Sequence, residues 1–549
     1  MHDETQQEQI LHCDVEVSSL AEVTSALDLP APKQHLPSAL RNVLSNWAGF
    51  ACSAGISFFL SPFVVHHLGN SAYGIWVLIG SLTGYLGLLN LGVRGAVTRY
   101  VARFHMESNH QEASAVTSSA LVIFMAAGIF AILLSLLLAA LVLPAFHIPQ
   151  SYQFAARVVV ILAGLNIAVS LISGVFGGVL TALHRFDLSN LIEVANSLLS
   201  ALAIVLVLSA GKGLIALALV NLTFAVAAGL TYTTVAFRLY PALMIRLSHC
   251  DRAHLKMIFS FSFYVFLLHI SFNLIFYTDA IVIGAFLSAG LVTFFAIAGN
   301  LMNYSRALIS GISTTMTPRA SALEASGGPG DVQKLLLKAV RFATLIIMPI
   351  SLTFLLRGSS FIRLWMGPQY GEQSGRVLWI LALALIFVAS DQVAISTMLG
   401  IGKQKLLAFV VLGEAVCNLV LSIAFVRPLG IFGVAWGTAL PSLVVSLLFW
   451  PWYVRSTLGI PVRSYIAFAW LRPGASAVPF GLLSYWIDRR WPAPNLFVYF
   501  LQVGAILPTV VLVAWYLCFD PSDRKIYAQR FVLPILRTIG WSREHSFVL

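Results

Sequence analysis

Residues 120–143 read ALVIFMAAGIFAILLSLLLAALVL, a run without a single charged side chain. A helix crosses the hydrocarbon layer of a bilayer with roughly 20 predominantly apolar residues. An open sheet would leave unpaired backbone groups in lipid, and a barrel would need short alternating segments. This stretch therefore predicts a membrane-spanning helix.

Fourteen such runs, bounded by Gly, Pro or charged residues, predict an all-α polytopic membrane protein. Hydrophobic residues make up 59% of the 549 residues and charged residues only 10%, whereas a soluble domain carries about 25% charged residues. The spans are expected near residues 42–65, 73–93, 115–145, 154–178, 187–209, 213–237, 258–287, 290–316, 335–356, 375–400, 405–427, 429–453, 465–487 and 496–518.

The order of the spans suggests two related halves. Glu193 and Asn196 lie in the fifth span, and Glu414 and Asn418 lie 221 and 222 residues later in the eleventh. Six spans in the same orientation in each half would form a parallel repeat. We expect one six-helix lobe over residues 41–240, a second over 255–455, and a final helix pair over 460–520.

The distribution of charge predicts the orientation. With the N-terminus in the cytoplasm, 23 of the 33 Lys and Arg residues fall in inside segments and 8 in outside ones, as the positive-inside rule requires. Both termini are then cytoplasmic: an acidic, disordered extension over residues 1–40 and a basic tail over 521–549. Because the basic residues lie in short loops between spans, nucleic-acid binding is not expected.

Several short stretches carry a resemblance to a known family. They are LGNSAYGIW at 68–76, LNLGVRGAVTRYVAR at 89–103, DAIVIG at 279–284, TPR at 317–319, LWMG at 364–367 and GIGK at 400–403. In these the chain resembles the polysaccharide (O-antigen) flippases of the multidrug/oligosaccharidyl-lipid/polysaccharide exporter superfamily. The resemblance covers roughly residues 38–520.

The resemblance implies twelve core helices in two lobes around a central cavity that opens alternately to each side of a bacterial inner membrane. It also implies that the cargo is an oligosaccharide linked to undecaprenyl diphosphate. Glycosyltransferases and a polysaccharide polymerase would be partners of such a protein, beside the membrane lipids.

The sequence contains no recognisable catalytic motif. It lacks a P-loop, a His-Glu-x-x-His zinc motif and a Gly-x-Ser-x-Gly elbow, which would mark nucleotide-binding or hydrolytic chemistry. The five cysteines are scattered without metal-ligand spacing. We therefore expect no cofactor, no metal site and no enzymatic activity. Transport would then be driven by a sodium or proton gradient, by the membrane potential or by the gradient of the cargo.

Arginines at the membrane are candidate ligands for a diphosphate, since a guanidinium can donate two parallel hydrogen bonds. Arg306 shares the eighth span with Asn300 and Asn303, and Arg94 follows the second span. Arg306 has an equally weighted alternative as the structural partner of Asp391. For Arg99 and Arg103 we favour a purely topological role.

A cation site is expected in the second half, built from Asp279, Glu414, Asn418 and Thr438. Glu414 and Asn418 are four residues apart and share a helix face. Two carboxylates at similar depth would repel each other unless a cation or a shared proton were present. Related flippases are thought to bind sodium in the corresponding lobe. The alternative is that Asn418 bonds a neighbouring helix and Asp279 faces water.

The resemblance implies translocation of a lipid-linked oligosaccharide by alternating access, and this is the function we favour. A lipid II flippase or a multidrug/cation antiporter of the same superfamily would share the architecture. A membrane-embedded glycan polymerase or ligase is the alternative from another class, and the shortness of the outside loops speaks against it.

Overall fold

The computed structural model describes residues 36–90, 92–246, 263–521 and 524. The predicted basic tail lies almost entirely outside these residues, as do Arg252 and Lys256 of one predicted inside loop. The predicted acidic extension is also outside them up to residue 35. Its last five residues belong to a helix instead, because α2 begins at Leu36.

The described residues form helices and no strands. The first lobe contains α2 (Leu36–Gly84), η1 (Tyr85–Asn90), α3 (Val93–Met106), α4 (His110–Leu137), α5 (Gln150–Ala182), α6 (Phe186–Ser209) and α7 (Leu214–Leu239). The second contains α9 (Phe263–Phe286), α10 (Ala289–Ser326), α11 (Pro329–Met366), α12 (Gln373–Gly400), α13 (Gln404–Leu429), α14 (Ile431–Val444) and α15 (Trp450–Leu458). The chain closes with α16 (Val462–Ile466), α17 (Arg472–Arg490) and α18 (Leu496–Leu517).

The predicted multi-span helical fold is confirmed. Twelve helical segments in the described chain are long and apolar enough to cross a membrane. The first of them contains two crossings, since the chain turns at Gly69, whose φ of 76° is left-handed. The more polar α10, 38 residues long, is not among the twelve, and with it the helical segments are consistent with the predicted number of about fourteen.

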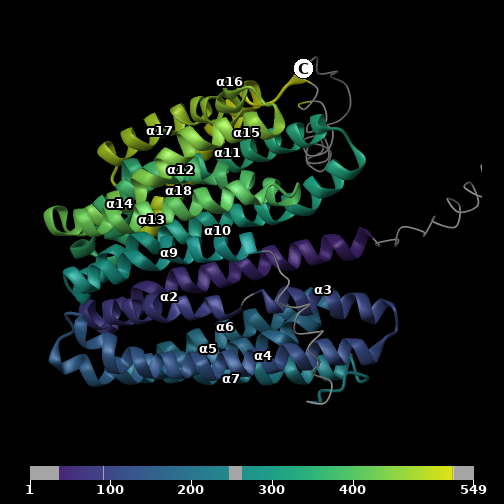
Figure 1. Cartoon of the computed structure of the whole chain (residues 1–549). Helices are drawn as coiled ribbons and strands as arrows, with labels where there is room; N and C mark the ends of the chain where they lie inside the picture. Colours follow the sequence, from purple (N-terminus) through teal and green to yellow (C-terminus); the bar gives the residue numbers. More distant parts are fainter. Residues whose placement is uncertain (1–35, 91, 247–262, 522–523, 525–549) are drawn as a thin grey trace, which may run out of the picture.

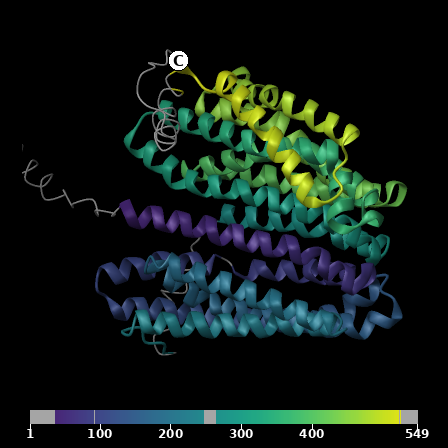
Figure 2. The same ribbon diagram turned by 180° about the vertical axis from the view of Figure 1, so that it is seen from behind.

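The helices gather in two groups on either side of α2 (Figures 1 and 2). Helices α3–α7 lie on one side and α9–α18 on the other, and α2 packs against both α6 and α10. The final pair, α17 and α18, packs on α11, and Figure 2 shows the yellow C-terminal end of the chain crossing the second group. We use first lobe for α2 to α7, second lobe for α9 to α15, and outer end for the end with Gly69 and Ser288. The opposite end is called the inner end, and both names follow the predicted topology.

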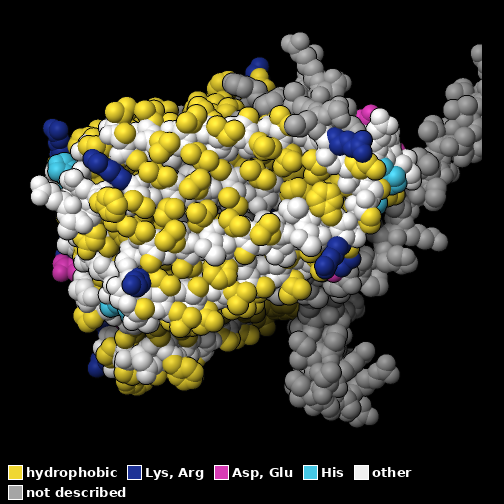
Figure 3. All heavy atoms as spheres, turned by 90° about the horizontal axis from the view of Figure 1, so that it is seen from below, with side chains coloured by type: hydrophobic (Ala, Val, Ile, Leu, Met, Phe, Trp, Pro, Cys, Tyr) yellow, Lys and Arg dark blue, Asp and Glu magenta, His cyan; other side chains and the backbone are white. Residues whose placement is uncertain are grey.

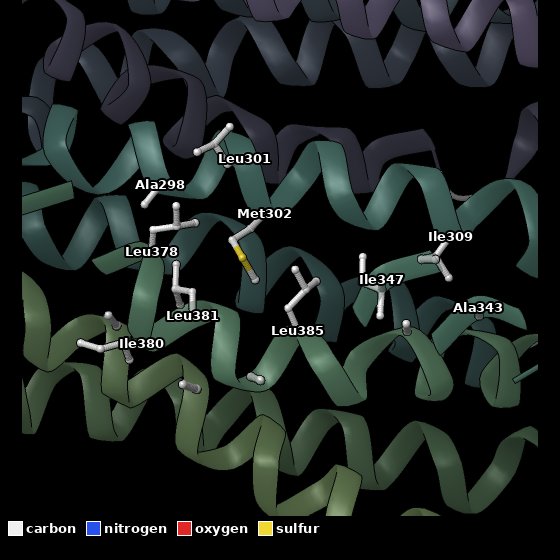
Figure 4. Close-up of a cluster of buried hydrophobic side chains, with 14 of the residues drawn as sticks. Ala298, Leu301, Met302, Ile309, Ala343, Ile347, Leu378, Ile380, Leu381 and Leu385 are labelled. Carbon is white, nitrogen blue, oxygen red and sulfur yellow. The ribbon is translucent and has the colours of Figure 1, made fainter. Parts of the chain in front are cut away.

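Each lobe has an apolar interior, and the molecule has an apolar exterior as well. Figure 4 shows Leu, Ile, Met and Ala side chains of α10, α11 and α12 meeting in the core of the second lobe. On the face seen in Figure 3, apolar side chains cover the middle, while charged side chains gather towards the two ends of the helices. An apolar belt between charged rims is the exterior expected of a membrane-spanning bundle.

The helical run of the second span breaks near its predicted end at 93, at a left-handed Gly92 (φ 74°), and the chain then re-enters helix as α3. Arg94 and Arg99 therefore lie on a helix packed in the lobe. Helix α11 continues past the predicted end at 356 to Met366, so Arg357, expected in an outside loop, is buried at 1% exposure.

Candidate functional site

A polar cluster lies where α9, α13 and α14 of the second lobe pack together. Asp279 of α9 is buried, and both of its carboxylate oxygens accept from the Thr438 hydroxyl of α14, at 3.0 and 2.8 Å. The Ser422 side chain of α13 also interacts with this carboxylate. The fold thus brings together Asp279 and Thr438, which the sequence placed in one site, and adds Ser422.

Asn418 lies one helical turn before Ser422 on α13, so the two side chains share a face. It is 1% exposed, and neither polar atom of its amide has a hydrogen-bond partner in the described part of the chain. Leaving a buried amide unpaired is costly. Asp279, Thr438, Ser422 and Asn418 supply carboxylate, hydroxyl and amide oxygens, which are the hard donors that an alkali cation accepts.

Arg306 of α10 lies between carboxylates of the second lobe. Its guanidinium is 5.1 Å from the ring centre of Phe276, and its electrostatic neighbours are Glu414 and Asp279. Its Nε has no hydrogen-bond partner among the described residues. Glu414, the remaining residue of the predicted cation site, also interacts with the Ser442 side chain.

Asp391 does not pair with Arg306, so the structural alternative weighed for that arginine is wrong. Asp391 is buried on α12 and accepts hydrogen bonds from Ser446 and, at 3.3 Å, from Ser390. The Trp470 indole in turn donates to Ser390 at 3.0 Å. These neighbours satisfy the carboxyl within the lobe and leave Arg306 to Glu414 and Asp279.

The two asparagines predicted beside Arg306 lie differently from each other. Asn300 donates to the Tyr73 hydroxyl of α2 at 3.2 Å, so it contributes to the contact between the lobes. Asn303 is exposed. Neither side chain lines the large cavity described next.

A cavity of about 1000 Å³ opens between the lobes. Its walls come from η1, α3, α5, α6 and α7 of the first lobe and from α9 of the second. Eleven of its lining residues have polar side chains: Asn90, Arg94, Thr98, Arg99, Thr181, Ser189, Asn190, Glu193, Tyr232, His269 and Asn273. A pocket of this size is ample for a ligand larger than a simple ion.

The three arginines of α3 have different surroundings. Arg94 lies over Gly177 of α5, where an added Cβ would be 3.4 Å from a guanidinium nitrogen, and it lines the cavity. Arg99, for which the sequence favoured a topological role, lines the cavity too. Arg103 is exposed and donates to Glu107 at 2.9 Å, and it is not part of the lining.

The lobes touch tightly at the outer end. An added Cβ on Gly74 of α2 would lie 1.7 Å from the Ala289 carbonyl oxygen. The Tyr370 hydroxyl donates to the Asn70 side chain at 2.5 Å, and the Thr293 hydroxyl donates to the Asn70 carbonyl at 2.7 Å. These contacts close the outer end, and others lie deeper, where the Tyr85 and Thr278 hydroxyls are 2.8 Å apart and an added Cβ on Gly84 would lie 2.5 Å from the Tyr277 ring. The large cavity lies at the end of Arg94 and Arg99.

Several lining residues were missed by the sequence reasoning, among them Tyr232, Asn90 and Asn273. Glu193 was noticed only as a marker of the repeat. One signal could have identified part of the set: Asn190, Glu193 and Asn196 recur at helical spacing along one face of an otherwise apolar span. No sequence pattern shows that α9 closes the opposite wall.

Comparison with known proteins places these features in context. The model of the family described as polysaccharide biosynthesis protein matches residues 67–375, more than half of the chain. A "Putative O-antigen transporter" of Shigella flexneri is 21% identical over 427 residues, which are 76% of this chain and 98% of that protein. A "Probable flippase AglR" of Haloferax volcanii is 23% identical over 458 residues, 83% of this chain and 91% of that protein.

Two solved structures share the fold. The lipid II flippase MurJ in an inward closed conformation aligns with a TM-score of 0.65 at 13% identity, covering 90% of this chain and all of that one. An inward-facing multidrug resistance transporter of the MATE family and MOP superfamily aligns with a TM-score of 0.64 at 17% identity, covering 75% of this chain and 95% of that one.

Proposed function

The chain belongs to the family of polysaccharide biosynthesis proteins, and on this premise we propose that it translocates lipid-linked oligosaccharides across the membrane by alternating access. The observation that carries the proposal is the cavity between the lobes that Arg94 and Arg99 line. An arginine pair in such a cavity suits a diphosphate, whose charge must be neutralised away from water. The cargo is a polysaccharide repeat unit on a polyprenyl diphosphate.

Transport is proposed to run from the inner to the outer leaflet of a bacterial inner membrane, with both termini in the cytoplasm. The arginine-lined cavity then faces the compartment in which lipid-linked glycans are assembled. Glycosyltransferases would supply the cargo and a polysaccharide polymerase would receive it. Reporter fusions after residues 211 and 328 should give outside and inside signals respectively, and the reverse pattern would refute this orientation.

The lipid-carrier proposal is tested in cells. Deleting the protein should trap lipid-linked glycan on the cytoplasmic leaflet without stopping its synthesis. Arg94→Ala should reproduce the block, whereas Arg103→Ala, on the same helix but paired with Glu107 outside the cavity, should export normally. Loss of glycan synthesis in the deletion strain would instead favour the polymerase or ligase alternative.

A coupling site for a monovalent cation is the second part of the proposal. Asp279, Glu414 and Arg306 together carry a net charge of −1 when all three are ionised, and such a residual charge is costly inside a membrane. One sodium ion or one proton would cancel it. Sodium would be held by oxygens of Asp279, Thr438, Ser422 and Asn418, and Arg306 would balance Glu414. A multidrug/cation antiporter of the same superfamily could use such a cation site as well. The arginines of the cavity are therefore the feature that favours a lipid-linked cargo over the substrate of an antiporter.

A further inference from the structure

Three helices of the first lobe carry small and polar side chains at helical spacing on the faces they turn to one another. Asn166, Ser170 and Ser173 recur on α5, Asn196 and Ser200 on α6, and Asn221 and Tyr232 on α7. Together they line a pocket of about 320 Å³, here called the N-lobe pocket. No Asp or Glu side chain is part of its lining, and Arg94 at its mouth is its one charged residue.

The pocket offers hydrogen-bonding groups that the described chain does not use. Asn196 and Ser200 make no hydrogen bond within it. The amide nitrogens of Asn166 and Asn221 donate to the Asn221 and Leu217 carbonyl oxygens, at 3.1 and 2.9 Å, which leaves both side-chain oxygens as acceptors. Inside a membrane, a polar group without a hydrogen-bond partner costs free energy, so such groups usually face a cavity or a ligand.

The N-lobe pocket joins the large cavity. Arg94 and Tyr232 line both spaces, so the two meet at the guanidinium that we assign to the diphosphate. At its other side, Asn166 and Asn221 also line a smaller space of about 210 Å³ that reaches Thr83 and Trp76. A group attached directly to a diphosphate at Arg94 would therefore lie at the entrance of the N-lobe pocket.

From this arrangement we infer that the N-lobe pocket is the binding site for one uncharged sugar, the one linked to the diphosphate. The inference rests on the proposed function, because it takes the diphosphate at Arg94 as its anchor. Sugar hydroxyls both donate and accept, which matches amide and hydroxyl side chains. The Phe224 ring and the alanines of α7 supply apolar contact for the ring of the sugar. With no charged group beyond Arg94, the pocket selects for a neutral sugar.

The test measures binding by the purified full-length protein in nanodiscs. The probes are a polyprenyl diphosphate and a panel of the same lipid bearing one neutral sugar: glucose, galactose or N-acetylglucosamine. The variant combines Asn196→Leu with Ser200→Val, two side chains without a hydrogen bond in the described fold. The matched control is Thr223→Val on α7, which is exposed and bonds only the Leu219 carbonyl of its own helix.

The wild type should bind at least one sugar-bearing lipid about tenfold more tightly than the bare diphosphate, as two neutral hydrogen bonds allow. The double variant should lose this preference and keep its affinity for the bare diphosphate, and Thr223→Val should behave as wild type. An unchanged preference in the double variant, or no preference for any sugar in the wild type, would overturn the sugar site alone. Failure of the wild type to bind any of these lipids would instead refute the proposed function on which it rests.

Discussion

Individual polar residues inside apolar spans were the most informative features of this sequence. Asp279, Arg306, Glu414 and Asn418 stand out because each interrupts a membrane-spanning run at a cost. The sequence could nominate them, yet it could not assign partners. The choice between Asp391 and Glu414 as the neighbour of Arg306 depends on how α10, α12 and α13 rotate against one another.

At this scale the cation site gives a prediction for transport by purified protein in liposomes. Asp279→Asn should weaken the dependence on a sodium or proton gradient, since it removes the charge that the cation would neutralise. Asn418→Leu should weaken the sodium dependence only, because an amide oxygen can bind sodium and has little role in holding a proton. Asp391→Asn, whose carboxyl is satisfied by serine neighbours, is the matched control. Wild-type ion dependence in both Asp279→Asn and Asn418→Leu would exclude the site.

Among the elements, α17 and α18 show what the apolar pattern leaves undecided. The sequence shows both helices as apolar runs, but it does not show which side chains join them to α11. The buried Arg357 of α11 donates to Asp488 of α17 at 3.1 Å and to Gln502 of α18 at 2.6 Å. The Arg357 guanidinium also lies 4.4 Å from the Tyr499 ring centre. Sequence reasoning had placed Arg357 in a loop, since apolarity falls before the helix ends.

We expect the ion pair between Arg357 and Asp488 to stabilise the packing of α17 and α18 on α11. Asp488→Ala should destabilise the protein by roughly 3–5 kcal/mol, because it leaves the Arg357 charge buried and unpaired. Thermal unfolding in detergent would report the change as a lower midpoint. Glu372→Ala is the matched control, since its pair with Arg376 is exposed and such pairs contribute about 0–1 kcal/mol.

The combined change of Arg357→Met and Asp488→Leu should recover much of the lost stability, because it removes both charges together. Equal midpoints for Asp488→Ala and Glu372→Ala would contradict the assigned role of the ion pair.

For the whole molecule, the sequence was sufficient to predict a multi-span helical fold with two lobes and a final pair. It could not predict which end is closed, since closure depends on contacts between residues far apart in the chain. The tightest of these is the approach of Gly74 to the Ala289 carbonyl oxygen. The other contacts at this end come from Asn70, Thr293 and Tyr370.

Closure of the outer end can be tested at Gly74. Gly74→Ala should prevent the lobes from meeting and slow transport, because its Cβ would clash with backbone. Gly55→Ala, on the same helix with open space around it, should leave transport unchanged. In a cysteine-free background, Asn300→Cys should react faster with a membrane-impermeant thiol reagent from the outer side when Gly74→Ala is present. Equal labelling with and without Gly74→Ala would contradict the closed outer end.

The most direct measurement of the proposed function follows a lipid-linked oligosaccharide in liposomes that contain only the purified protein. Cargo placed in one leaflet is scored by its accessibility to a membrane-impermeant lectin on the opposite side. Wild type and Arg103→Ala should move the cargo, and Arg94→Ala should move it roughly ten- to a hundredfold more slowly, as loss of charge-assisted hydrogen bonds implies. Cargo that stays in its original leaflet with the wild-type protein, under sodium and proton gradients of either direction, would contradict the account.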